Sequence, residues 1–375
     1  MRANYTCKNC GAQYKLSDRR WRCDCGSYLD IEIDLNSLSF GINNIDSRYF
    51  GLWRYHKVIP VDTKSIVSFN EGYTPLISAK SFGYPNAYFK LEYLFPTGSF
   101  KDRGTTVAVS KLNELGIPEF SMDSSGNAGA SFAAYAALAG IKANIFVPYD
   151  TPEEKTNQIR IYGAHLIKIK GSKKDVTEAA MKYGETTFYA GHQINPYFLE
   201  GMKTMFYEMV EQMKWTSIDA IVTPAGVGTI VLGIYKAAKE LLYFGLIDKM
   251  PRIYAVQIAN CAPIYAAYHN LAYMDFVKED YCVKSLAEGV AIPNPMRVQQ
   301  ILEVIKETKG DVILVCEKET REGLISLSKK GLFVEPTSAI VFPALEKALY
   351  EHKIDNDEVV IAPLTGFGLK HNLFA

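Results

Sequence analysis

The sequence predicts an α/β protein with mostly parallel sheets that are covered by helices on both faces. From about Trp53 onward, short runs rich in β-branched residues alternate with helix-length amphipathic or alanine-rich stretches. The strand-like runs lie at residues 143–147, 220–223, 253–257, 312–315 and 358–362. This alternation is typical of parallel sheets built from strand–helix–strand units.

The length of the chain favours two domains. It has 375 residues, and single hydrophobic cores stop growing at about 250–300 residues. Hydrophobic residues make up 48% and charged residues 22% of the chain, a balance that leaves ample material for cores.

The charge balance argues against a nucleic-acid or membrane partner, because Lys plus Arg and Asp plus Glu both number 41 and create no global field. The N-terminal residues contain no apolar run, so we expect no secretory signal. The most apolar stretch, residues 131–147, is interrupted by Lys142, and we interpret it as a buried helix and strand. The seven cysteines show no even, disulfide-like framework, and we expect a reducing cytoplasm.

Four cysteines near the N-terminus predict a metal site. Cys7 and Cys10 are separated by two residues, and Cys23 and Cys25 by one; a glycine follows each pair. Glycine permits the tight turn that directs two thiolates at one ion. We expect a four-cysteine zinc ribbon over residues 1–38 in which the zinc is structural. The alternative is a set of free or redox-active thiols, and the second pair is one residue shorter than the usual spacing.

The segment PTGSFKDRG, residues 96–104, points to a reactive lysine. Proline and glycine mark a turn, Ser99 is a candidate N-cap, and residues 105–115 have a helical pattern. Lys101 would lie in the first turn, where the helix dipole disfavours a cation by about 0.3–1 kcal/mol and so lowers the amine pKa. Such a lysine suits Schiff-base chemistry, although position alone favours an ordinary solvated lysine.

Two loops before predicted helices are candidate anion sites. Ser124, Ser125, Gly126 and Asn127 precede an alanine-rich helix over residues 128–140. The loop Gly226-Val227-Gly228-Thr229 follows the strand at 220–222 and opens another helix. Helix N-termini and glycine-rich backbone bind phosphate and carboxylate groups. Taken singly, each loop also fits an ordinary helix start.

Together these motifs resemble a known family. PTGSFKDRG closely resembles the lysine motif of threonine synthases and their pyridoxal-phosphate (PLP) dependent relatives, the fold type II or tryptophan synthase β-like enzymes. Other segments follow in the family's order along nearly the whole chain: EGYTPL at 71–76, SSGNAG at 124–129, NPYFLEG at 195–201, GLFVEP at 331–336 and TGFGLK at 365–370.

The resemblance implies two αβα domains with the cofactor in the cleft, in addition to the N-terminal ribbon. The large domain would comprise residues 39–90 and 200–375, and the small domain residues 91–199. It further implies a cytoplasmic homodimer that acts on a small amino-acid substrate.

The resemblance also assigns roles to residues. Lys101 would form the Schiff base with PLP, and Asn127 would bind the phenolic oxygen of its ring. Ser124 and Ser125 would face the substrate carboxylate, and Thr365 would meet the pyridine nitrogen. The PLP phosphate would be held by Gly226, Val227, Gly228 and Thr229. A neutral hydroxyl at the ring nitrogen leaves the ring less protonated, which favours β-elimination and replacement.

The implied reaction converts O-phospho-L-homoserine and water to L-threonine and phosphate. The sequence departs from the family at the substrate phosphate: His192 and Gln193 replace an Asn-Ser pair, and Phe198 replaces an arginine. An aromatic ring cannot replace a bidentate guanidinium, so His192, Gln193 and Lys203 become the candidate phosphate partners.

Two alternatives stay open at this point. One is a related enzyme that performs β-elimination, like serine or threonine dehydratases, or β-replacement, like cysteate or cysteine synthases. The segment SLAEGVA at residues 285–291 mildly supports it. The other is a non-catalytic zinc-ribbon protein, which the intact Lys101, Asn127 and Thr365 disfavour.

Overall fold

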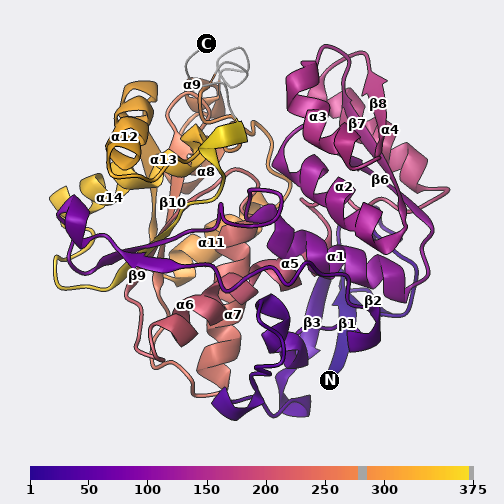
Figure 1. Cartoon of the computed structure of the whole chain (residues 1–375), viewed down its shortest axis with the longest axis horizontal. Helices are drawn as coiled ribbons and strands as arrows, with labels where there is room; N and C mark the ends of the chain where they lie inside the picture. The colour runs from indigo at the N-terminus through magenta and orange to yellow at the C-terminus, as the bar shows by residue number, and fades with distance from the viewer. Residues whose placement is uncertain (278–284, 371–375) are drawn as a thin grey trace. The chain divides into compact units, whose positions relative to one another are not determined.

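The structure, a computed structural model, describes residues 1–277 and 285–370, and these pack as two units (Figure 1). Unit 1 comprises Met1–Gly72 and Lys101–Thr204, and unit 2 comprises Tyr73–Phe100 and Met205–Ala375. The expected boundaries differ from this division, because residues 39–72 and 200–204 belong to unit 1 and residues 91–100 belong to unit 2. In the first of these segments the indole Nε1 of Trp53 donates to Thr106 Oγ1 at 2.9 Å, with both side chains buried.

Unit 1 contains an antiparallel N-terminal sheet, in the order β2-β1-β3, and a parallel sheet, in the order β6-β7-β8. Its strands are β1 (Arg2–Thr6), β2 (Gln13–Lys15), β3 (Asp30–Asp34), β6 (Glu119–Asp123), β7 (Lys142–Pro148) and β8 (His165–Ile169). Its α-helices are α1 (Lys101–Glu114), α2 (Asn127–Ala139), α3 (Glu153–Ile161), α4 (Lys173–Gly184) and α5 (Pro196–Met202). Short 3-10 helices precede them: η1 (Leu35–Ser37), η2 (Ile42–Asn44), η3 (Leu52–Val58) and η4 (Thr63–Ser65).

Unit 2 is built on a mixed six-stranded sheet in the order β11-β10-β9-β12-β5-β4, in which only the pairing of β4 with β5 is antiparallel among the described strands. The strands are β4 (Leu76–Ser78), β5 (Ala87–Lys90), β9 (Ala220–Pro224), β10 (Arg252–Ile258), β11 (Asp311–Val315) and β12 (Val360–Pro363). The helices are α6 (Thr204–Gln212, beginning at the boundary residue), α7 (Thr229–Tyr243), α8 (Pro263–Tyr268), α9 (Tyr273–Phe276), α11 (Val298–Glu307), α12 (Glu317–Lys329), α13 (Pro336–Ala339), α14 (Val341–Tyr350), η5 (Lys80–Phe82) and η6 (Gly368–Lys370).

The alternation of strands and helices expected from the sequence is confirmed. Every residue of β9 is buried, as expected for a parallel strand covered on both faces. The apolar stretch 131–147 forms the end of α2 and most of β7, so its interpretation as a helix and a strand is confirmed. The helix α2 ends at Gly140, whose positive φ of 67° allows its amide to bond back to the last turn.

A buried charge network fixes the segment Tyr73–Phe100 within unit 2. Lys90 and Glu208 are fully buried and pair at 2.9 Å, and the same ammonium donates to the Thr74 carbonyl at 2.6 Å and to Gln212 Oε1 at 2.9 Å. Removing one partner of a buried pair leaves an uncompensated charge. The network therefore ties β5 and the turn before β4 to α6.

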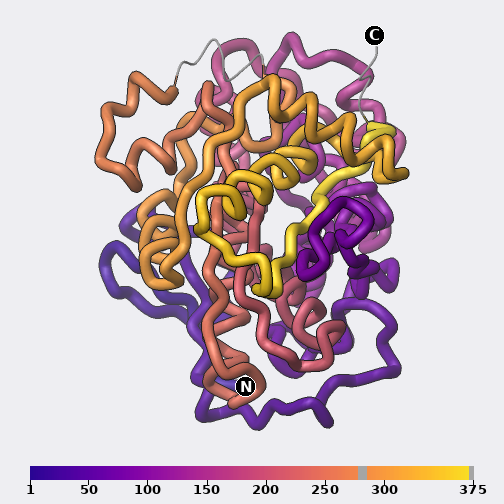
Figure 2. Tube along the Cα trace, turned by 90° about the vertical axis from the view of Figure 1, so that its left-hand side faces the viewer, coloured from indigo at the N-terminus to yellow at the C-terminus, as the bar shows by residue number. Residues whose placement is uncertain are grey.

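The last strand lies in the interior of the unit 2 sheet. Figure 2 shows the yellow trace near the C-terminus running beside the purple segment that contains β5. On the side of β12 away from β5, Val360 and Ile361 pair with β9. The C-terminal residues are thereby brought beside a segment that is about 270 positions earlier in the chain.

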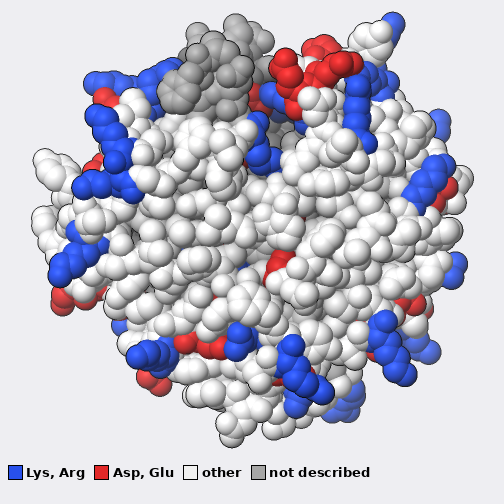
Figure 3. All heavy atoms as spheres, in the orientation of Figure 1, with Lys and Arg blue, Asp and Glu red and all other residues white. Residues whose placement is uncertain are grey.

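Charged side chains of both signs are intermixed on the face shown in Figure 3, and the described residues form no large patch of one sign there. None of the helices in the described part of the chain has the length and hydrophobicity that a membrane crossing requires.

Candidate active site and cofactor-binding loops

Lys101 is the first residue of α1, as the sequence predicted within one turn. Close packing against α5 holds this helix. A Cβ on Gly104 would lie 2.4 Å from the ring of Phe198, and one on Gly201 would lie 2.0 Å from the Arg103 carbonyl oxygen. Backbone approach at this distance requires glycine. The start of α1 is therefore rigidly placed within unit 1.

A second set of contacts joins the first turn of α1 to α2. The hydroxyl of Ser131 lies 2.6 Å from Asp102 Oδ1 and 2.7 Å from Thr105 Oγ1, and all three residues are fully buried. Thr105 in turn donates to the Lys101 carbonyl at 3.0 Å. Because Ser131 is one turn after Asn127, these bonds fix the residue after Lys101 relative to the helix that Asn127 begins.

The loop at residues 124–127 lies between β6 and α2. Asn127 is the first residue of α2, and the Gly126 N–H bonds to Ser124 Oγ at 3.3 Å. A Cβ on Gly129 would lie 2.1 Å from the Ser124 carbonyl oxygen, so the loop folds closely over the helix start. Ser124, Ser125 and Asn127 each keep part of their surface exposed, which a ligand contact requires.

Next to this helix start, His192 and Phe198 form an aromatic wall near the lysine. The Phe198 ring is fully buried, stacks on Phe132 with a centroid distance of 6.2 Å, and contacts the His192 ring at 5.6 Å. The Lys101 ammonium lies 5.8 Å from the Phe198 centroid. Phe198, at the position of the family's arginine, is thus a core residue beside the Lys101 ammonium.

The environment of His192 favours the neutral imidazole. Its Nδ1 is buried and has no hydrogen-bond partner among the described residues. Burial, and secondarily the charge of Lys101, lowers the His192 pKa well below 6.5. A neutral imidazole can donate one hydrogen bond but contributes no positive charge to a phosphate site.

Lys203 has a different environment from the one the sequence suggested. Its ammonium pairs with Glu200 at 2.7 Å and donates to the Val58 carbonyl at 2.7 Å, and both charged side chains are fully buried. These contacts use the charge of Lys203 within the core. They disfavour a direct role in phosphate binding, and the assignment of Lys203 to the substrate site stays a prediction.

The candidate phosphate loop lies in unit 2 between β9 and α7. Gly228 precedes the helix with a positive φ of 77°, and a Cβ there would lie 2.1 Å from the Ile301 side chain. The first N–H groups of α7 have no earlier helical carbonyl to bond, so they can bind an anion. Thr223 Oγ1, in the strand before the loop, is buried and has no partner among the described residues.

Thr365 lies in a buried hydroxyl pair with Ser338, a residue that the sequence analysis missed. The two oxygens are 3.0 Å apart. Ser338 Oγ also accepts from the backbone N–H groups of Thr365 at 2.9 Å and Gly366 at 2.7 Å. Ser338 thus fixes the Thr365 turn. A serine just after the GLFVEP motif was the available signal, but nothing in the sequence placed it beside Thr365.

The four N-terminal cysteines come together as predicted. Their sulfur atoms all lie within 4.8 Å of one another, with 3.6 Å between Cys7 and Cys25 and 3.5 Å between Cys10 and Cys23. About 3.8 Å between ligands follows from tetrahedral zinc with bonds of about 2.3 Å. The cluster therefore fits a four-coordinate ion, with alternate cysteines buried and exposed.

The structure groups the predicted residues in two sets. Lys101, Ser124, Ser125, Asn127, His192 and Gln193 belong to unit 1, and the 226–229 loop and Thr365 belong to unit 2. Unit 1 thus has a lysine at a helix start, and unit 2 has a glycine-rich helix N-terminus of the kind that binds anions. A family model described as pyridoxal-phosphate dependent enzyme matches residues 67–366. The chain belongs to this family.

The chain is also similar to individual proteins over nearly its whole length. The chain is 35% identical to a threonine synthase of Methanocaldococcus jannaschii, covering 97% of this chain and 92% of that protein. It is 32% identical to a threonine synthase of Methanosarcina acetivorans, covering 97% and 91%. Among solved structures, serine racemase from Dictyostelium discoideum matches with a TM-score of 0.65 and 26% identity, covering 84% of this chain and 96% of that one.

A threonine deaminase from Solanum lycopersicum matches with a TM-score of 0.66 at 20% identity, covering 84% of this chain and 89% of that one. Because the identity to the deaminase is only 20%, this similarity supports the fold alone. The α/β fold is thus the type II fold of PLP-dependent enzymes.

Proposed function

We propose that the chain is a threonine synthase, a lyase that converts O-phospho-L-homoserine and water to L-threonine and phosphate. The observation that carries the proposal is the motif lysine at the first position of α1, in a chain that matches threonine synthases over nearly its whole length. The proposal extends to the substrate, which the lysine geometry alone does not specify.

The residues present fit PLP. The helix start at Gly228 and Thr229 offers N–H groups to a phosphate, and Gly228 adopts the left-handed conformation at which a side chain is rarely found. We propose that Gly226, Val227, Gly228 and Thr229 bind the cofactor phosphate. Lys101 would hold the cofactor covalently, and Asn127 and Thr365 would bind its ring oxygen and ring nitrogen.

The hydroxyl pair supports the assignment of Thr365. Ser338 Oγ accepts two backbone N–H groups, and its own proton has two acceptors within reach, Thr365 Oγ1 at 3.0 Å and the Gly366 carbonyl oxygen at 3.3 Å. We propose that it is donated to Thr365 Oγ1 when the cofactor is bound. Thr365 then retains its own proton for an acceptor, and an unprotonated ring nitrogen is such an acceptor. This arrangement favours a neutral ring.

PLP, when bound, would supply an electron sink for negative charge that develops on the substrate. The Lys101 Nζ would carry protons between Cα, Cβ and Cγ of the substrate. Ser124 and Ser125 would bind the substrate carboxylate, and His192 and Gln193 would contact its side chain. Water adds at Cβ after phosphate leaves Cγ.

One experiment tests the substrate assignment. The purified PLP-loaded protein is incubated with O-phospho-L-homoserine, and threonine and phosphate are measured together. Equal release of both products is expected. Release of 2-oxobutanoate from L-threonine, without threonine formation from the phosphorylated substrate, would replace the proposal by the second candidate.

The second candidate is β-elimination or β-replacement on an amino acid without a phosphate. The aromatic wall favours it, because Phe198 and the neutral His192 supply no cation near Lys101 and Lys203 is held by Glu200. A dianionic phosphate ordinarily requires charged donors. The relative rates on O-phospho-L-homoserine, L-serine and L-threonine separate the two candidates.

We also propose that the cysteine cluster binds one structural zinc ion. The four thiol sulfurs fill a tetrahedral set, and Tyr14 and Asn9 contact Cys23 and Cys25 at 3.2 and 3.7 Å, as outer partners of a metal site do. A cytoplasmic homodimer stays a prediction from the family resemblance, and light scattering of the purified protein tests its oligomeric state.

A further inference from the structure

In unit 1, backbone hydrogen bonds connect two of the proposed substrate-binding segments, the 124–127 loop and the segment that leads to His192. The strand β6 ends at Asp123, directly before the 124–127 loop. The segment that leads to His192 runs beside β6, because the Ser121 N–H donates to the Phe188 carbonyl at 2.8 Å and the Ala190 N–H donates to the Ser121 carbonyl at 2.8 Å. Tyr189 therefore lies alongside the end of β6.

A side-chain bond closes this arrangement. The Tyr189 hydroxyl donates to Asp123 Oδ1, and Thr177 Oγ1 donates to Asp123 Oδ2 at 2.5 Å. Burial raises the pKa of Tyr189 well above 10, so its hydroxyl remains a donor. A Cβ on Gly191 would lie 2.1 Å from the tyrosine oxygen, so the chain that leads to His192 folds directly over the bond.

The N-terminal segment that carries the cysteine cluster also contacts Tyr189. The Trp21 ring packs edge-on against Tyr189 with a centroid distance of 5.2 Å, and the partly buried indole lies against the apolar cluster that contains Tyr189. The adjacent Arg22 forms an ion pair with Glu185 at 2.8 Å. Trp21 lies two positions before Cys23, so the indole is close in the chain to the cysteine cluster.

We propose that Tyr189 is a positioning residue that fixes the 124–127 loop and the His192–Gln193 pair relative to each other, and that Trp21 of the cysteine ribbon supports it. The inference rests on the proposed function in that both segments are taken to bind the amino-acid substrate. It assigns the N-terminal ribbon a role in substrate affinity in addition to its own folding.

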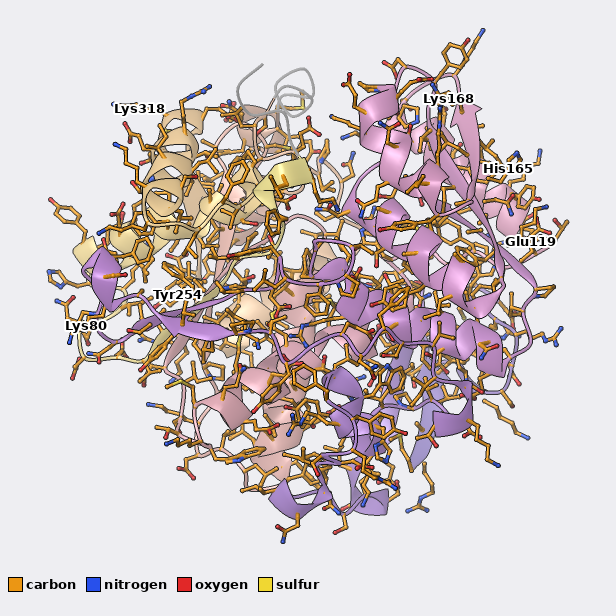
Figure 4. The ribbon with its side chains drawn as sticks, viewed as in Figure 1. Lys80, Glu119, His165, Lys168, Tyr254 and Lys318 are labelled. Carbon is orange, nitrogen blue, oxygen red and sulfur yellow. The ribbon has the colours of Figure 1, made fainter. Side chains whose placement is uncertain are left out.

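Tyr189→Phe removes the hydroxyl but keeps the ring against Trp21. The matched control is Tyr183→Phe, because Tyr183 donates to Glu119 at 2.8 Å. Glu119, labelled in Figure 4, begins the same strand that Asp123 ends. The two variants therefore remove the same kind of bond from opposite ends of β6.

We expect Tyr189→Phe to raise the KM for O-phospho-L-homoserine about ten-fold or more, as loss of a bond to a charged group does, with kcat changed about two-fold at most. Tyr183→Phe should leave the KM unchanged. PLP affinity, read from visible absorbance, should be the same in both variants. An unchanged KM in Tyr189→Phe, or equal changes in the two variants, would overturn the proposal.

Trp21→Leu tests the ribbon contact without touching the hydrogen bond. We expect a smaller rise in KM with retained PLP affinity, whereas Arg2→Ala, at an exposed ion pair of the same sheet, should have no effect. A Trp21→Leu enzyme with the KM of the wild type would remove the ribbon from the proposal.

The dissociation constant of L-threonine, from the change in visible absorbance, is measured in the same set. This dissociation constant reports amino-acid binding independently of turnover. If the wild type released no threonine from O-phospho-L-homoserine, the proposed function would fail, whereas a weakened L-threonine constant in Tyr189→Phe would still support the positioning role.

Discussion

The backbone N–H of Phe100 donates to the carbonyl oxygen of Thr365 at 3.0 Å. Both residues belong to unit 2, and Phe100 directly precedes Lys101 in the sequence. Ser99 also forms a β-bridge with Gly366, and the Phe367 N–H donates to the Gly98 carbonyl at 3.0 Å. The backbone around Thr365 thus holds the peptide that leads into Lys101.

Lys101→Ala should abolish the visible absorbance of the PLP-loaded protein and lower threonine formation by roughly 10³-fold or more, because no other amine replaces the covalent link. Absorbance after gel filtration and product assays check this. Lys64→Ala, at an exposed lysine of η4, is the control. A Lys101→Ala protein that kept the wild-type absorbance would show that another lysine binds the cofactor.

Ser338→Ala should destabilise unit 2 by about 1–3 kcal/mol, because the buried N–H groups of Thr365 and Gly366 lose their acceptor. Urea unfolding measures the loss. The visible spectrum of bound PLP should also shift, since Thr365 is released. Ser328→Ala, at an exposed position of α12, should change neither quantity, and equal stability of the two variants would contradict the assignment.

The neutral His192 predicts a pH-dependent stability. Its folded pKa lies well below the ordinary 6.5, so below pH 6.5 the unfolded chain binds a proton that the folded chain does not. The free energy of unfolding therefore carries no penalty from His192 above pH 6.5, and it decreases as the pH falls below this value. Going from pH 7.5 to 5.5 should lower the free energy of unfolding more in the wild type than in His192→Gln. Urea unfolding at both pH values tests this, and parallel losses would assign the proton to another group.

Zinc removal should destabilise the N-terminal sheet without removing PLP. Cys7→Ser is expected to lose stoichiometric zinc, measured by atomic absorption, and to lower the thermal midpoint, because a four-coordinate ion contributes folding free energy directly. The visible absorbance of PLP should remain. Cys316→Ser, at an exposed free thiol of unit 2, serves as the control. Wild-type protein purified without zinc and of unchanged stability after chelation would refute the site.

Much of the architecture was predictable from local patterns. The predicted strands at 220–223 and 253–257 lie within β9 and β10, and the helices at 105–115 and 128–140 correspond to α1 and α2 within a few residues. Strong periodicity and β-branched runs fix these elements locally. The strands β6 and β8 escaped the sequence analysis, because EFSMD and HLIKI mix polar and apolar residues without a long β-branched run.

The site was only partly predictable, for a different reason. Motif order located Lys101, the 226–229 loop and Thr365. The partners that hold them, Ser338 for Thr365 and Ser131 for Asp102, come from other elements and meet them only through the fold. Lys203 and Glu200 form an ion pair and lie within one helix turn of each other. Their spacing in the sequence alone could not show that both side chains are buried.

The position of β12 has a consequence for synthesis of the chain. This strand is the last of the described strands to leave the ribosome, yet it lies between β9 and β5. Until it arrives, β5 and β9 each present an unpaired edge, the kind of surface that promotes association between chains. A nascent chain that stalls before residue 360 should therefore depend on chaperones, and a truncation at that point should aggregate rather than form a smaller native protein.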